Sequence, residues 1–286
     1  MKRYLSLIKF SHTIFAMPFA LIGYAMGVRD GGFSWQILVG VIACMVLARS
    51  AAMAFNRVVD RRFDAANPRT ATREIPAGKI SVAAARLFVV ICSVGFIAVA
   101  ATFNTLTLIL SPVALAVILG YSYMKRFTSL CHLVLGLGLA IAPSAAYIAA
   151  TGTLTLLSIL YSFVVLTWVA GFDIIFALQD VEFDSSAGLF SIPSKIGIGN
   201  GLIVSGALHF LTLCSAIAAA GLMIDQYQAN RPLLWSGVVA FGILLLYQHL
   251  IVKPTDLSRV NLAFGTTNGI ASIVYATLVI ASIWFA

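Results

Sequence analysis

The amino-acid sequence predicts an all-α integral membrane protein that forms a bundle of nine transmembrane helices. Hydrophobic residues make up 61% of its 286 residues and charged residues only 10%, and the mean hydropathy is +1.01. A soluble domain is about half apolar and about a quarter charged, so this chain has too few charges to coat a surface in water. We expect one transmembrane domain over residues 1–286, with two pseudo-repeat halves at about 1–125 and 126–286.

Nine apolar segments are long enough to cross a bilayer, which requires about 20 residues of helix. The third and fourth segments are joined by a very short link around Asn104. The number of predicted helices falls to eight if this link does not interrupt the helix. Pro18, Pro112 and Pro143 lie within or near the segments and predict kinks that neighbouring helices accommodate. The segments are 12–28, 35–57, 82–101, 105–123, 130–150, 155–178, 202–223, 232–251 and 263–285.

The basic residues are distributed unequally between the two sides of the predicted bundle. Fourteen of the 18 Lys and Arg residues fall on one side, which the positive-inside rule assigns to the cytoplasm. We therefore expect a bacterial inner-membrane protein with its N-terminus in the cytoplasm and its C-terminus on the opposite side. The fourteen residues are Lys2, Arg3, Lys9, Arg57, Arg61, Arg62, Arg69, Arg73, Lys79, Lys125, Arg126, Lys195, Lys253 and Arg259.

The net charge of +8 does not indicate a nucleic-acid partner. The basic residues lie at the ends of apolar segments and form no basic face or patch interleaved with aromatic residues. Membrane topology together with an anionic substrate explains them better. The four cysteines lie inside apolar stretches and form no C-x-x-C pair, so they predict neither a zinc site nor a disulfide framework.

Only two loops between the predicted helices are long, at about 58–81 and 179–201, and both lie on the side assigned to the cytoplasm. The loops resemble each other: VVDRRFDAA at 58–66 aligns with LQDVEFDSS at 178–186, and IPAGKIS further on with IPSKIG. An internal repeat with matching acidic helix ends suggests two half-sites that face one cavity. Seven of the ten acidic residues gather in or beside these loops: Asp60, Asp64, Glu74, Asp173, Asp180, Glu182 and Asp184.

The acidic residues of each loop are spaced by four or seven positions, so they share one face of a helix. Like charges at this spacing repel each other, and a bound cation removes the repulsion. Oxygen ligands without His or Cys suit Mg²⁺, Mn²⁺ or Ca²⁺, and Mg²⁺ typically combines one or two carboxylates with substrate phosphates. Solvation of two loops is the simpler alternative. The predicted catalytic residues are Asn56, Asp60, Asp64, Asp173, Asp180 and Asp184, of which Asp60, Asp64, Asp180 and Asp184 are the predicted Mg²⁺ ligands.

Basic and aromatic residues on the same side are candidates for binding diphosphate oxygens and stabilising a leaving group. Ordinary membrane topology explains any single one of them equally well. Arg49 differs, because it lies inside an apolar segment, where a charge is costly without a partner. We expect Arg49 to pair with the acidic residues or with substrate. The candidates are Arg49, Arg69, Arg73, Lys79, Tyr123, Lys125, Arg126 and Lys195.

The histidines give weaker signals than the acidic residues. His132, His209 and His249 are isolated in or near apolar runs, and we expect them to pack rather than to bind a ligand. His12 lies where the first segment begins, close to Lys9, and is a candidate for the mouth of the cavity.

These motifs resemble those of the UbiA superfamily of intramembrane prenyltransferases over nearly the whole chain. The first motif, N-x-x-x-D-x-x-x-D, begins at Asn56 and is followed by NPRTATREIPAGKIS. The second acidic motif begins at Asp180, with Asp173 upstream, and a Tyr-Lys element occupies 121–125. Within the superfamily, the runs IKFSHTIFAMPFALIGYAMG and NRVVDRRFDAANPRT look most like the 4-hydroxybenzoate polyprenyltransferases and their menaquinone-route relatives.

The resemblance implies nine helices around a central cavity, with magnesium and a prenyl diphosphate held between two cytoplasmic-side acidic loops. It also implies that an allylic cation forms, that an electron-rich aromatic ring attacks it, and that the ring then loses a proton. The expected partners are a polyprenyl diphosphate, an aromatic acid of the 4-hydroxybenzoate type and membrane lipids, in a pathway of quinone biosynthesis. Lys9 and His12 are the expected acceptor-binding residues.

Three alternative functions stay open at the level of sequence. One is the prenylation of a dihydroxynaphthoate in a menaquinone route. Another is prenyl transfer to haem, chlorophyll or a glyceryl lipid. The third is membrane transport, because transporters are also built from internal repeats.

Overall fold

The computed structural model of this protein describes residue 7 and residues 15–285, and most of these residues are helical. Among them, eight helices are long and apolar enough to cross a membrane. A further helix, α2 (Met17–Gly31), packs against α7 (Cys131–Thr151) over much of its length. The prediction of an all-α membrane bundle is confirmed, whereas the ninth span and the cytoplasmic side of the loops stay predictions.

Short helical segments connect some of the long helices. The long helices are α3 (Trp35–Val59), α5 (Val82–Ala100), α6 (Thr105–Gly120), α7, α8 (Leu156–Ala177), α11 (Ile198–Tyr227), α12 (Arg231–Ile251) and α13 (Asn268–Trp284). The short ones are α4 (Arg61–Ala66), the 3₁₀ helices η2 (Tyr121–Arg126) and η3 (Leu178–Asp180), α9 (Val181–Ser186), α10 (Ile192–Ile196) and the π-helix η4 (Leu262–Thr267).

Polar residues fix the beginnings of several long helices. The side chains of Ser34, Ser81, Asn104 and Thr155 each accept a hydrogen bond from a backbone N–H of the first turn of α3, α5, α6 and α8. Such caps satisfy donors that have no partner within the helix. Asn104 also donates to the backbone oxygen of Ile148 in α7, at 2.8 Å. The short link around Asn104 therefore separates two helices, and it anchors α6 to its neighbour.

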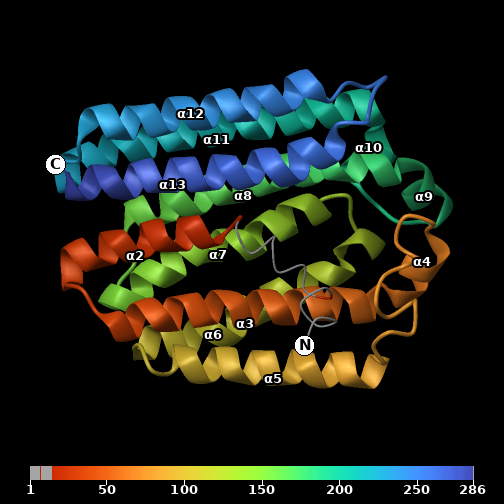
Figure 1. Ribbon diagram of the computed structural model, residues 1–286, viewed down its shortest axis with the longest axis horizontal. Helices are drawn as coiled ribbons and strands as arrows, with labels where there is room; N and C mark the ends of the chain where they lie inside the picture. The colour runs from red at the N-terminus through yellow and green to blue at the C-terminus, as the bar shows by residue number, and fades with distance from the viewer. Residues whose placement is uncertain (1–6, 8–14, 286) are drawn as a thin grey trace.

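The long helices lie roughly parallel in layers, and the short helices α4, α9 and α10 gather at one end of the bundle (Figure 1). The largest buried cluster contains packed aromatic rings that join α2, α8, α12 and α13 through Phe19, Trp168, Phe241 and Tyr275. On α5, by contrast, large apolar side chains such as Val90 are exposed. In a membrane protein such a surface faces lipid. Apolar side chains therefore occupy both the core of the bundle and its outer surface.

The end of the bundle opposite α4 and α9 is tied together by one carboxylate. Asp30 Oδ2 accepts hydrogen bonds from the hydroxyls of Tyr147, at 2.6 Å, and Tyr227, at 2.7 Å. These three residues belong to α2, α7 and α11, which are far apart in the sequence. Asp30 therefore fixes the spacing of three helices at the end that lies away from the acidic loops (Figure 1).

Close approach of α7 to α8 depends on a glycine. Gly136 is buried in α7, and a Cβ atom at this position would overlap the backbone oxygen of Leu166 in α8. Backbone oxygens cannot move aside as the end of a flexible side chain can, so a larger residue has to push the two helices apart. The nearby Gly138 is a matched comparison, because a Cβ there would meet its nearest atoms at 3.9 Å.

We expect Gly136→Ala to lower the free energy of unfolding by about 1–3 kcal/mol, because overpacking forces the backbone to shift. Gly138→Ala should change it by less than about 1 kcal/mol, since alanine favours helix and meets no clash. Thermal unfolding in detergent micelles checks both variants. Equal stability of Gly136→Ala and the parent protein would contradict this packing.

Candidate active site

The two acidic segments adopt the same local structure. Asp60 ends α3 and precedes the six-residue helix α4, while Asp180 ends η3, after α8, and precedes the six-residue helix α9. The backbone angles at the two junctions are alike, with φ −88° and ψ 6° at Asp60 and φ −108° and ψ 6° at Asp180. Asp64 and Asp184, four residues further on, are both buried. The sequence repeat therefore corresponds to a repeat in local geometry.

Hydrogen bonds between the loops bring the two acidic segments together. Arg69, from the first loop, donates through Nε to Asp180 Oδ1 at 2.9 Å and through Nη2 to Asp180 Oδ2 at 2.5 Å. Asn67 donates through Nδ2 to the same Oδ1 at 3.2 Å. The bidentate pair is the geometry in which arginine binds a carboxylate most strongly. The sequence did not single out Asn67 as a ligand, because its partner lies 113 positions away.

Two consecutive basic residues of η2 contact one acidic segment each. Lys125 Nζ lies 3.0 Å from Asp184 Oδ2, and Arg126 Nη2 lies 3.1 Å from Asp60 Oδ1. Because Lys125 and Arg126 are adjacent in the chain, the carboxylates that they bind must lie close together. α4 and α9 indeed lie side by side at one end of the bundle (Figure 1).

Asp64 is the carboxylate with the least complete set of partners. Its Oδ1 accepts a hydrogen bond from Arg73 Nη1 at 2.5 Å, but its buried Oδ2 accepts none. Nη1 of the buried Arg57 lies 4.0 Å from Oδ2. The sequence suggested only a topological role for Arg57, which belongs to α3, whereas Asp64 belongs to α4. A buried carboxylate oxygen without a donor suits an additional cation.

The charge of Asp60 is also incompletely compensated. Asn56 Nδ2 donates to its Oδ2 at 2.8 Å, as the spacing of four predicted. Burial raises the pKa of the Asp60 carboxyl above its usual value, and the hydrogen bond and charge of Arg126 oppose this shift only in part. Binding of a cation favours the ionised form, so cation binding and ionisation of Asp60 support each other.

The site offers oxygen ligands but no preformed cage for a metal. Among the residues that the structure describes, no three His, Cys, Asp or Glu side chains converge on one point. Basic side chains pair with all four of the predicted ligands, Asp60, Asp64, Asp180 and Asp184. Mg²⁺ commonly takes only one or two carboxylates and completes its shell with substrate phosphates and water. The residues present therefore fit Mg²⁺ bound together with a diphosphate.

Asp173 has a partner that the sequence analysis assigned to packing. Its Oδ2 lies 2.6 Å from Nδ1 of His132, the second residue of α7. Asp173 belongs to α8, seven residues before Asp180, as the spacing predicted. The expectation that His132 only packs is therefore incomplete, because its side chain is buried against a carboxylate of the predicted site.

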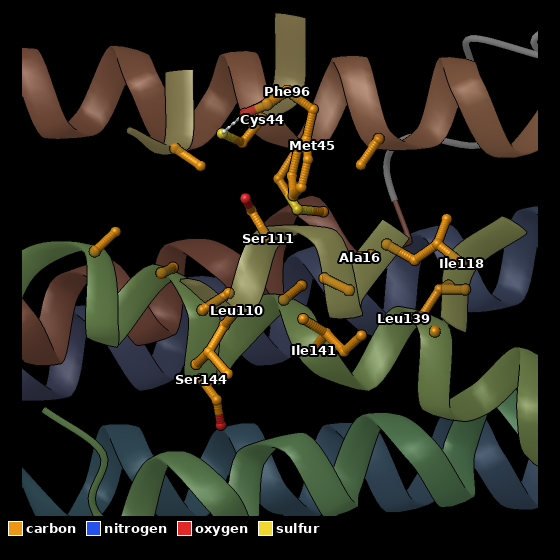
Figure 2. Close-up of a pocket in the computed structure, with 18 of the residues that line it drawn as sticks. Ala16, Cys44, Met45, Phe96, Leu110, Ser111, Ile118, Leu139, Ile141 and Ser144 are labelled. Atoms are coloured by element: carbon orange, nitrogen blue, oxygen red, sulfur yellow. Dashed lines mark hydrogen bonds between the residues drawn. The ribbon is translucent and has the colours of Figure 1, made fainter. Parts of the chain in front are cut away.

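An apolar cavity of about 420 Å³ lies between α3, α5, α6, α7 and α8. Figure 2 shows Met45 of α3 and Ser111 of α6 lining it, with a hydrogen bond from Cys44 to the backbone oxygen of Phe96 beside them. Most of its lining is hydrocarbon, and Ser111 and Ser144 already donate to neighbouring backbone oxygens at 2.8 Å and 3.0 Å. A cavity whose polar groups are satisfied holds hydrocarbon better than water.

The cavity reaches the helices that carry the acidic residues. Arg49 and Tyr121 line it, and Arg49 lies seven residues before Asn56 on α3, about 10 Å along the helix at 1.5 Å per residue. Elsewhere, Val113 of α6 and Ile159 of α8 belong to the lining and are exposed on the outer surface of the bundle. One region of the cavity is therefore near the charged cluster, and another is open to lipid.

Arg49 forms no ion pair with any carboxylate of the described residues, and its Nε is buried without a hydrogen-bond partner. Of its two expected partners, the acidic residues do not contact Arg49, which lines the cavity about three helical turns before Asp60 on α3. A role in substrate binding stays a prediction. An unpartnered guanidinium in an apolar wall is costly unless an anion binds beside it.

The remaining predicted residues are placed in different ways. Tyr123 packs against Phe55 and under the guanidinium of Arg126. Lys79 and Lys195 are exposed. Lys9 and His12 lie outside the described residues. The diphosphate- and acceptor-binding roles of these residues stay predictions.

The fold and the site define an integral membrane protein with a charged cluster at one end of its helical bundle and a hydrocarbon cavity beside it. The chain matches the UbiA prenyltransferase family over residues 16–283 and belongs to that family. It is therefore a prenyltransferase, as the sequence motifs predicted.

Relatives of known name extend over most of the chain. A 4-hydroxybenzoate octaprenyltransferase of Photobacterium profundum is 31% identical over 253 residues, which are 88% of this chain and 86% of that protein. A protein of the same name from Vibrio atlanticus is 33% identical over 264 residues, 91% and 88% of the two chains.

Solved structures show the same fold. The apo structure of a UbiA homologue from Aeropyrum pernix K1 superposes with a TM-score of 0.83 and 32% identity, and covers 94% of this chain and 97% of that one. A UbiA homologue from Archaeoglobus fulgidus, solved bound to GPP and Mg²⁺, has a TM-score of 0.74 at 22% identity and covers 99% of each chain.

We expect Lys125→Met to lower the free energy of unfolding by about 1–3 kcal/mol, because the buried Asp184 then loses its charged donor. Adding Asp184→Asn to this variant should restore part of the loss, since the unpaired charge is removed. Arg62→Met, at an exposed position, should change stability by less than about 0.5 kcal/mol. Thermal unfolding in detergent checks all four proteins, and no recovery in the double variant would contradict the pair.

Proposed function

We propose that this protein transfers a polyprenyl group from its diphosphate to an aromatic acid of the 4-hydroxybenzoate type. The observation that carries the proposal is the meeting of two acidic helix ends, each paired with partly exposed cations, beside a cavity lined by hydrocarbon. The names of the bacterial relatives support 4-hydroxybenzoate as the acceptor. A diphosphate needs the charged cluster, and its prenyl chain needs the cavity.

The proposed diphosphate site is the cluster of carboxylates and basic residues at α4, η2 and α9. Arg69, Arg73, Lys125 and Arg126 hold the carboxylates through side chains that keep part of their surface exposed. Exchange of these cations from carboxylate to diphosphate oxygens would free Asp60, Asp64, Asp180 and Asp184 to hold Mg²⁺. Bound there, Mg²⁺ would neutralise charge that develops on the departing diphosphate.

The residues of the chain assist ionisation in two further ways. The guanidinium and ammonium groups stabilise the leaving group through charge-assisted hydrogen bonds that strengthen as the C–O bond breaks. The apolar wall of the cavity keeps water away from the allylic cation, which water would otherwise convert to an alcohol. The aromatic ring then attacks the cation, and the proton that it loses leaves with solvent or with a carboxylate of the site.

The cavity beside the cluster supports a position for the prenyl chain. Its lining is apolar, and part of it is open to lipid at Val113 and Ile159. A long prenyl chain that begins at the charged cluster can follow this cavity and continue into the bilayer without contact with water. The product, which is more apolar than the acceptor, can leave by the same route.

The charge of Arg49 supports a position for the acceptor. The carboxylates of the cluster leave its guanidinium unpaired at the boundary between the apolar cavity and the charged site. An aromatic acid offers a carboxylate for this guanidinium and an apolar ring for the cavity wall. Arg49 would therefore bind the acceptor, rather than the diphosphate that the sequence suggested.

The orientation in the membrane follows from the distribution of charge. We infer that the acidic loops lie in the cytoplasm of a bacterial cell, because fourteen of the 18 Lys and Arg residues fall on the side of the predicted bundle that carries these loops. A charged diphosphate and an aromatic acid in the cytoplasm would then reach the site without crossing the membrane.

We expect Asp64→Asn and Asp184→Asn each to reduce kcat/KM by about 100-fold or more, since each removes a charge that binds Mg²⁺ and diphosphate. Asp256→Asn, on an exposed turn outside the cluster, is the matched control and should retain full activity. The assay measures prenylated 4-hydroxybenzoate formed from polyprenyl diphosphate with Mg²⁺ and again with excess chelator. Full activity of either cluster variant, or activity in chelator, would contradict the proposed site.

We expect Arg49→Met to raise the KM for the aromatic acid by about 10-fold or more and to leave the KM for the prenyl diphosphate nearly unchanged, because a charged hydrogen bond is worth about 1.5–3 kcal/mol. Arg49→Lys keeps the charge, so its KM for the aromatic acid should lie between those of the parent protein and Arg49→Met. If only the KM for the prenyl diphosphate rises, Arg49 binds the diphosphate and the proposed role in acceptor binding is contradicted.

The choice of acceptor is tested by comparing 4-hydroxybenzoate with dihydroxynaphthoates at equal concentration. We expect 4-hydroxybenzoate to have the higher kcat/KM. Prenylation of a dihydroxynaphthoate alone would assign the protein to a menaquinone route instead.

A further inference from the structure

His132 joins three helices at the buried side of the charged cluster. It lies at the beginning of α7, its Nδ1 is 2.6 Å from Asp173 Oδ2 in α8, and its Nε2 is 3.3 Å from the backbone nitrogen of Ile192. Ile192 is the first residue of α10. The His132 side chain has no exposed surface, so both ring nitrogens depend on these partners.

The contact with Ile192 fixes which ring nitrogen carries the proton. A backbone N–H can only donate, so Nε2 of His132 must be the acceptor and carries no proton. In a neutral imidazole the proton is then on Nδ1, which donates to Asp173. The same contact satisfies a donor in the first turn of α10 that has no partner within the helix.

Asp173 differs from the four predicted metal ligands in the kind of donor that it has. Asp60, Asp64, Asp180 and Asp184 each pair with a Lys or Arg side chain that keeps about a quarter or more of its surface exposed. Such side chains can exchange their carboxylate for a diphosphate. His132 is fully buried and tied at both nitrogens, so it cannot leave Asp173 when substrate binds.

The other oxygen of Asp173 remains available. About 20% of the Asp173 side chain is exposed, and among the described residues only His132 donates a hydrogen bond to it, at Oδ2. One oxygen is therefore held on the protein side, and the carboxylate plane has a single preferred orientation. This is the arrangement in which a partner outside the reacting atoms orients a group that acts on them.

We propose that His132 is a positioning residue for the transfer reaction. It fixes Asp173 through Nδ1–H and links that carboxylate to the beginning of α10 through Nε2. The proposal rests on the proposed function, because it assigns Asp173 to the site where diphosphate and acceptor react. It concerns the orientation of Asp173 and requires no change in the protonation of His132.

Two substitutions separate the contacts of His132. In His132→Asn, the side-chain amide lies near the position of Nδ1 and can still donate to Asp173, but it cannot reach Ile192. In His132→Gln, the amide lies near the position of Nε2 and can reach Ile192, but it leaves Asp173 without its donor. His249→Asn is a matched control, because His249 contacts His209 and no carboxylate of the site.

We expect His132→Gln to lower kcat by about 10- to 100-fold with little change in the KM for prenyl diphosphate, the usual loss for a missing orienting partner. His132→Asn should recover most of the activity, and His249→Asn should retain all of it. The unfolding temperatures of the two His132 variants should be similar. Equal activity of the two variants, when both are folded, would overturn the positioning role.

A double variant keeps the test decisive if His132→Asn does not fold. If His132 acts through Asp173, adding His132→Gln to Asp173→Asn should cause no further loss of kcat, because the carboxylate that it positions is already absent. A further loss equal to that of His132→Gln alone would overturn the proposal.

Nitrogen NMR of protein labelled with ¹⁵N-histidine tests the geometry without the reaction. The parent protein in detergent should show a neutral histidine protonated at Nδ1, which disappears in His132→Gln and shifts in Asp173→Asn. Absence of this signal would overturn the proposal even in an active enzyme. If the signal is present but no acceptor is prenylated, then the proposed function fails and the contact between His132 and Asp173 stands.

Discussion

The structure depends on one electrostatic constraint, which is that carboxylates at the end of an apolar bundle must be compensated. Asp184 is only 2% exposed, and an unpaired charge at such a position is strongly unfavourable. The chain meets this constraint with cations from other elements: Arg69 from the first loop reaches Asp180, and Lys125 from η2 reaches Asp184. Because each pair joins segments that are distant in sequence, compensation of charge also assembles the site.

Compensation by side chains and the capacity to bind a charged substrate follow from the same arrangement. The cations on Asp60, Asp64, Asp180 and Asp184 are partly exposed, so substrate oxygens can compete for them without unfolding the bundle. Beyond this cluster the walls become apolar, and the cavity serines Ser111 and Ser144 donate to backbone oxygens. A substrate with a charged head and a hydrocarbon chain matches a charged cluster beside an apolar cavity. Arg49 is the exception at the boundary, because its Nε is buried without a hydrogen-bond partner.

Spacing along a helix predicted part of the site well. The contact between Asn56 and Asp60 follows from their separation of four residues. Contacts between residues that are distant in the sequence could not be predicted from spacing. His132 contacts Asp173, which lies 41 positions further along the chain. Its neighbours in the sequence are apolar, so they gave no indication that its side chain binds a carboxylate. Burial of Arg49 was predicted, but its separation from the acidic residues depends on the direction of α3 relative to the cavity.

The sequence by itself determined the class of protein, the helical segments and the two acidic motifs, because hydropathy and helical periodicity are local properties of the chain. The internal repeat suggested that the motifs face one cavity, but the tertiary structure alone decided which cation compensates which carboxylate and which helices line the hydrocarbon cavity. These features depend on how helices pack across long separations in sequence. Charge compensation in a medium of low polarity is decided by distance in space, and a linear pattern does not contain that distance.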